Sequence, residues 1–172
     1  MQYFFIFVLT ILLENDVPPK WYMDDIAYHE GEWIAVNSDY KNEDEPFDLY
    51  IIEWELGVTG NTLHGKLYGR ANHVDSEPFW EFYQYWDVAE EQAVLIQTGT
   101  DGTLGKGEIH FIEEGHTEFV QVFTLPDGRN WSQKHTNVVM DIFTETNTSF
   151  YLDEEGEWLE DRTYIWVKQM NK

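Results

Sequence analysis

Short aromatic-rich segments, each closed by a glycine, asparagine or aspartate turn, fill the chain from residue 31 to residue 170. Apolar and polar side chains alternate along them with period two, which is typical of β-strands. No stretch between them is long enough for the crossover that a parallel sheet requires. We therefore expect an all-β protein with one antiparallel sheet. An up-and-down barrel is the simplest arrangement without free edges, and a two-sheet sandwich is the alternative.

Turn residues place the boundaries of these segments. Asp101-Gly102 predicts a hairpin, and Pro126-Asp127-Gly128 predicts a turn, because proline fixes one central dihedral and glycine supplies a positive one. A short helix over residues 20–29 follows Pro19, and it either covers one end of the barrel or serves as a connector. The expected strands are residues 33–36, 49–56, 63–70, 79–87, 92–99, 104–112, 117–125, 130–143, 149–152 and 158–169.

The chain divides into an apolar leader, residues 1–17, and a single β-barrel domain, residues 18–172, since 172 residues suit one core. The apolar run from Tyr3 to Leu13 is too short to span a bilayer as a helix, which takes about 20 residues. Its length fits the core of a secretory signal, but no Lys or Arg precedes it and no small-residue cleavage site follows. A signal or tether and a retained, packed segment are both open. For the same reason, the location of the protein stays open between secreted or periplasmic and cytoplasmic.

The charge of the chain narrows its partners. Asp and Glu number 33 against 10 Lys and Arg, a net charge of -23. Such a field repels phosphate backbones and anionic membrane surfaces, so we expect no nucleic-acid partner. The carboxylates are scattered, which favours a solvated acidic exterior. Without cysteine, the chain can form no disulfide and no zinc–sulfur site.

The segment Gly31-Glu32-Trp33 resembles the Gly-x-Trp at the start of the first strand in lipocalins and the wider calycin superfamily. The layout of residues 20–170 is similar to that of small uncharacterised bacterial lipocalin-like domains. The resemblance implies a calycin-like barrel of 8–10 strands that holds a ligand. It also implies that Trp33 closes the barrel floor beneath a basic residue of the last strand, for which Arg162 is the candidate. It does not identify the ligand.

The segment from Arg129 to Asn137 is the most unusual part of the chain. Its alternate residues Trp131, Gln133 and His135 share a face that suits neither solvent nor a dry core. A polar-lined cavity wall is one interpretation, and polar residues near the barrel mouth are the other. The same alternation selects neighbours on other strands. The expected ligand-contacting residues are Trp131, Gln133, His135, Gln84, Trp86, Gln97, Arg162 and Tyr164.

No sequence motif assigns catalysis or a cofactor. The chain has no nucleophile elbow, no phosphate loop and no histidine pair at metal-ligand spacing. We therefore name no catalytic or metal-binding residue, and expect a barrel that binds a small hydrophobic or amphipathic molecule. Three alternatives remain. One is an enzyme that uses the same cavity, and another is haem or metal binding through one interior histidine, His135 or His110. The last is a structural domain with a filled interior.

Overall fold

The computed structural model describes residues 17–170, so the prediction for the apolar leader falls on residues outside that range. Within residues 17–170, one helix precedes eleven strands, and the helix and the strands over residues 49–56 and 92–99 have their expected bounds. The elements are α1 (Lys20–His29), β1 (Gly31–Val36), β2 (Leu49–Leu56), β3 (Thr62–Ala71), β4 (Val74–Asp75), β5 (Trp80–Asp87), β6 (Gln92–Gly99), β7 (Leu104–Glu113), β8 (His116–Thr124), β9 (Asn130–Asp141), β10 (Thr144–Leu152) and β11 (Trp158–Lys168).

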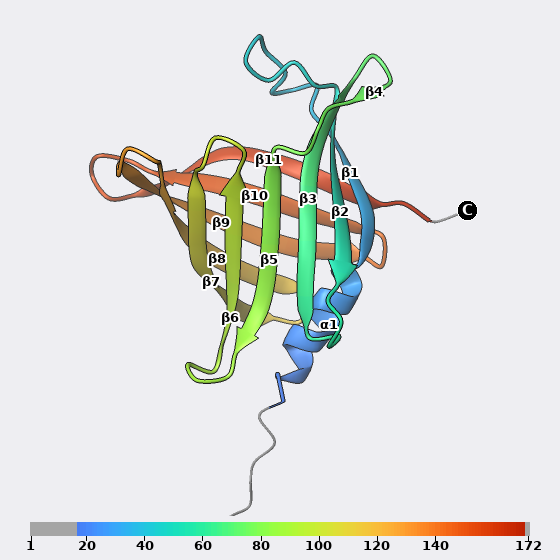
Figure 1. Ribbon diagram of the computed structural model, residues 1–172, viewed down its shortest axis with the longest axis vertical. Helices are drawn as coiled ribbons and strands as arrows, with labels where there is room; N and C mark the ends of the chain where they lie inside the picture. Colours follow the sequence, from blue (N-terminus) through green and yellow to red (C-terminus); the bar gives the residue numbers. More distant parts are fainter. Residues whose placement is uncertain (1–16, 171–172) are drawn as a thin grey trace, which may run out of the picture.

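The sheet closes on itself because β1 pairs with both β2 and β11. All pairings are antiparallel. They join consecutive strands except for β1–β11, which closes the barrel, and β3–β5, because β4 pairs only with β3. The result is a closed barrel of ten strands with β4 attached at its rim (Figure 1). This confirms the predicted all-β antiparallel barrel with a short N-terminal helix, and the sandwich is not formed.

One hairpin differs from the prediction. The expected strand over residues 130–143 instead ends at Asp141, and β10 already begins at Thr144. The turn between them carries Ile142 and Phe143, where no glycine or proline marks a break. The carboxylate of Asp141 makes the turn by accepting a hydrogen bond from the backbone N–H of Phe143 at 2.8 Å.

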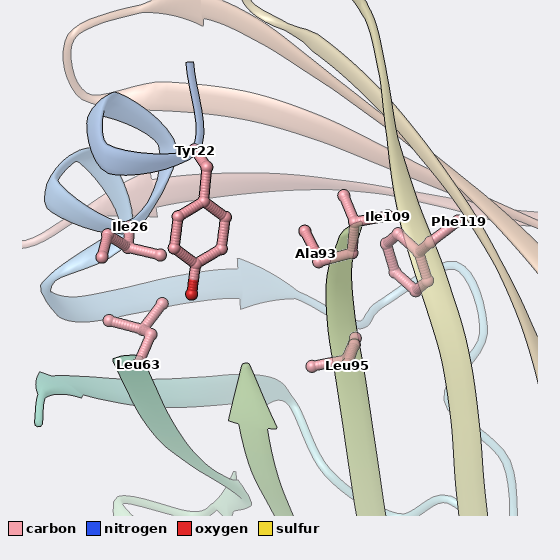
Figure 2. Packing of buried hydrophobic residues seen from close by; sticks show 7 residues of the cluster. All are labelled: Tyr22, Ile26, Leu63, Ala93, Leu95, Ile109 and Phe119. Carbon is pink, nitrogen blue, oxygen red and sulfur yellow. The ribbon is translucent and has the colours of Figure 1, made fainter. Parts of the chain in front are cut away.

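The helix α1 lies across one end of the barrel, as the first of the two interpretations predicted (Figure 1). Tyr22 and Ile26 are fully buried and approach inner-face residues of β3 and β6, including Leu63 and Ala93 (Figure 2). The Tyr22 hydroxyl donates to the backbone carbonyl of Asn61 at 3.0 Å, in the β2–β3 turn. The loop over residues 37–48 and β4 lie at the opposite end.

The basic partner of Trp33 is Lys168, so the prediction of Arg162 is wrong. Trp33 is buried and faces Lys168 in the β1–β11 pairing, with the Lys168 Nζ 5.5 Å from the indole centroid. Arg162 is six residues earlier on β11, about 20 Å along the strand at roughly 3.3 Å per residue. There its guanidinium lies 5.3 Å from the ring centroid of Tyr40. The final strand ends at Lys168, one residue short of its expected end, and its pairing with β1 places Lys168 opposite Trp33.

Two glycines thin the inner face of β7. A Cβ on Gly105 would lie 2.5 Å from the Phe123 ring, whereas a Cβ on Gly107 would lie 2.0 Å from the backbone carbonyl oxygen of Val120. The ring of Phe123 therefore fills the place of one missing side chain. At Gly107 the backbones of β7 and β8 themselves approach too closely for any side chain.

We expect Gly107→Ala to lower the free energy of unfolding by about 2–3 kcal/mol, because a neighbouring strand has to move. The matched Gly105→Ala should cost clearly less, since the Phe123 side chain can rotate away. Urea denaturation of both variants measures the difference. An equal cost at the two positions would contradict this account of the β7–β8 approach.

Candidate functional site

A cavity of about 700 Å³ occupies the barrel interior. Its volume falls within the range of roughly 300–1,000 Å³ that is usual for small-molecule sites. The helix α1 borders it at one end, and Asp44, Glu45 and Phe47 of the 37–48 loop border it at the other. Side chains therefore leave the interior partly empty. The purely structural alternative required a filled interior, so the cavity is evidence against it.

The two sides of the cavity differ in chemistry. Strands β2, β3 and β5 present mainly aromatic and aliphatic groups, whereas β9, β10 and β11 present mainly polar ones. Residues of the apolar wall are Tyr50, Ile52, Trp54, Leu67, Phe79 and Phe82, and residues of the polar wall are Gln133, His135, Asn137, Asn147, Ser149 and Arg162. A molecule bound between them would meet rings on one side and hydrogen-bonding groups on the other.

Six of the eight predicted contact residues line this cavity: Gln84, Gln97, Gln133, His135, Arg162 and Tyr164. Two do not. Trp131 is 42% exposed near the end of β9 and stacks on Phe123 at 5.0 Å between centroids. Trp86 packs under the helix, 5.6 Å from Tyr22. Period two gives the face of a strand but not the depth along the barrel, so it does not show whether a side chain reaches the cavity. Ligand contact stays a prediction for all eight residues.

A buried charged cluster links the helix to the polar wall. His29 places Nδ1 2.8 Å from the Asp25 backbone carbonyl and Nε2 3.0 Å from a Glu145 carboxylate oxygen. The side chain of Asp25 accepts a hydrogen bond from the Gln84 amide at 2.9 Å. A carbonyl and a carboxylate can only accept, so the imidazole must carry both protons.

The pKa values of the cluster agree with this protonation. Burial lowers the pKa of His29, but the carboxylates of Glu145 and Asp25 outweigh it and raise the pKa to about 10. Burial raises the pKa of the Asp25 carboxyl, and the charge of His29 offsets part of that rise. Sequence reasoning missed all three residues. The four-residue spacing of Asp25 and His29 on one helix face was the available signal.

A second charged group lies toward the other end of the cavity. Arg162 donates from Nη1 to both carboxylate oxygens of Glu45, at 3.0 and 2.8 Å, and from Nε to Asp161 at 3.2 Å. Tyr50 also donates to Glu45, at 3.1 Å. Burial lowers the pKa of Arg162, but Glu45 and Tyr164 raise it by more, so the guanidinium keeps its charge. The contacts tie the 37–48 loop to β2 and β11.

Unlike His29, His135 has no charged partner within hydrogen-bonding distance among residues 17–170. Its ring stacks on Phe119 at 4.7 Å, and Nδ1 lies 3.5 Å from the Asn147 side-chain oxygen. Burial lowers the pKa of His135 to about 4, so the ring is neutral at pH 7. His110 is instead exposed on the outer face of β7, and the idea that it could serve as an interior ligand is wrong.

Gln121 is the least satisfied group of the interior. It lies on the β8 face that carries Thr117 and Phe119, both of which line the cavity. Its side chain is fully buried, and neither its amide nitrogen nor its oxygen has a hydrogen-bond partner among residues 17–170. A buried polar group without a hydrogen-bond partner costs on the order of 1–3 kcal/mol of folding free energy, and such groups are uncommon in folded proteins.

No family model matches the chain, and no curated protein matches it in sequence. Within residues 17–170, no group of three or more His, Asp or Glu side chains is arranged to hold a metal ion. In the same range, no helix has the length and hydropathy needed to cross a membrane. The case for function therefore depends on the cavity.

We expect His135 to make the protein less stable in acid. The unfolded chain takes up a proton near pH 6.5, whereas the folded protein does so only near pH 4, so stability falls as the pH drops between these values. Urea denaturation at neutral and acid pH should show a smaller acid loss in His135→Gln, by on the order of 2 kcal/mol. His110→Gln is the control and should behave as the unmodified protein. An unchanged acid loss in His135→Gln would refute the assignment.

Gln121→Met should raise the free energy of unfolding by about 1–2 kcal/mol, because it removes an unpaired amide while keeping the side-chain volume. Gln133→Met, on the adjacent strand but lining the cavity, is the control and should not stabilise the protein. Urea denaturation again measures the effect. A less stable Gln121→Met protein would mean that the amide has a partner in solution.

Proposed function

We propose that the protein binds a small, mostly apolar molecule in the barrel interior. The observation that carries this proposal is the cavity of about 700 Å³ between an aromatic wall and a polar wall. Pockets of this kind gain affinity from apolar contact and fix orientation through a few polar groups. The helix closes one end, so a ligand would enter beside the 37–48 loop.

The lipocalin-like assignment belongs to the same proposal. It is supported by the closed antiparallel barrel and by Trp33, which is buried at the helix end with the Lys168 ammonium near its ring. These are the features that the Gly-x-Trp resemblance implied, with Lys168 in place of Arg162. They support the fold relationship and leave the ligand open.

Acid–base catalysis in the same cavity is a second candidate function, favoured by one observation. Asp25 and His135 both line the cavity, and burial shifts the pKa of both. The two functions differ in what happens to the bound molecule. Native mass spectrometry of the purified protein, followed by release and a second incubation, would recover the same mass from a binding protein and a changed mass from an enzyme.

Filling the cavity should abolish binding. Leu67→Trp places a large ring in the interior, and we expect it to weaken binding of the uncharged dye N-phenyl-1-naphthylamine by at least about tenfold. Lys66→Trp adds the same ring to the exposed face of the same strand and should bind as the unmodified protein does. Fluorescence titration gives the affinities, and thermal melts confirm that both variants fold. Equal binding by the two variants would place the dye outside the barrel.

A further inference from the structure

The lining of the cavity carries more negative than positive charge. Its carboxylates are Asp25, Asp44, Glu45, Glu145 and Asp161. Only two cationic groups oppose them, His29 and Arg162, because His135 is neutral at pH 7. Each cation is already held by two carboxylate residues. A negatively charged ligand would meet repulsion at both ends of the cavity.

The helix end of the cavity has unused capacity to accept hydrogen bonds. Asp25 and Glu145 together present four carboxylate oxygens, yet only two hydrogen bonds from residues 17–170 reach them. One comes from His29 and the other from Gln84, while the second proton of His29 goes to a backbone carbonyl. An ammonium group has three donors and one positive charge, and both match what this cluster lacks.

The groups around this cluster also suit a cation. The Trp54 ring lines the cavity with its centroid 6.3 Å from that of His29, and an indole face attracts cations. The amides of Asn137 and Asn147 line the adjacent polar wall.

We propose that the ligand carries a positively charged amine, which binds at Asp25 and Glu145, while its apolar body lies along the wall formed by Tyr50, Ile52 and Trp54. This inference rests on the proposed function and narrows it to cationic amphiphiles. Fatty acids and other carboxylate-bearing amphiphiles are expected to bind more weakly. The net charge of -23 additionally concentrates cations near the entrance.

Three dansyl probes that differ only at the end of one alkyl chain test the proposal. They carry an ammonium (dansylcadaverine), a methyl (N-hexyl dansylamide) or a carboxylate (dansyl-6-aminohexanoic acid). We expect the ammonium probe to bind at least about tenfold more tightly than the methyl probe, and the carboxylate probe at least about tenfold more weakly. The order should persist at about 0.5 M salt, because a buried contact is screened far less than the field of surface charges.

Two variants locate the contact. Glu145→Gln and Asp25→Asn should each reduce the preference for the ammonium probe over the methyl probe to about threefold or less. Glu108→Gln, on the exposed face of β7, should keep the full preference. Thermal melts accompany each titration, and the comparison of probes on the unmodified protein stands even where a variant fails to fold.

The outcomes separate this inference from the function beneath it. If the methyl probe binds as tightly as the ammonium probe, or if the preference disappears in salt, the protein binds apolar molecules and the amine proposal is overturned. A preference that survives in both Glu145→Gln and Asp25→Asn also overturns the assigned contact. If none of the three probes binds, the proposed function itself fails and this inference fails with it.

Discussion

Pairing of β1 with both β2 and β11 closes the barrel, and its ten-strand circumference decides what the interior can be. Barrel diameter grows with strand number, and about eight strands already suffice for side chains to fill the interior or for one small ligand to fit. Ten strands enclose more volume than that. The cavity thus follows from the closure.

A barrel this wide needs a separate element to close its end, and α1 supplies it. Tyr22 and Ile26 pack as an apolar plug, but the buried His29–Glu145 contact is costly to form. Buried ion pairs often stabilise no more than apolar residues of similar volume, because both charges lose their hydration. Stability alone therefore gives no reason for a charged cluster at this position. A polar occupant of the cavity would give one, because the cluster lines it.

Strand alternation and turn residues were sufficient to predict the antiparallel barrel, the helix and the inner faces of most strands. The turn at Ile142 escaped because its signal is one Asp141 side-chain hydrogen bond. Arg162 was assigned to Trp33 because local pattern cannot tell how far a strand extends along its neighbour. The Asp25, His29 and Glu145 cluster joins residues 116 positions apart, and such contacts arise only from the closed topology.

The position of the charges bears on the entry of a ligand as well as on its affinity. At the loop end, Glu45 and Asp161 surround Arg162, so the guanidinium offers an incoming anion little uncompensated charge. At the helix end, both N–H groups of the His29 imidazolium already donate hydrogen bonds to protein acceptors. The two cationic side chains that could orient a carboxylate are therefore already neutralised by acidic neighbours, and the remaining charges of the cavity are negative. Selectivity among amphiphiles would therefore arise from the sign of the head group, while the aromatic wall accepts apolar bodies of different shapes.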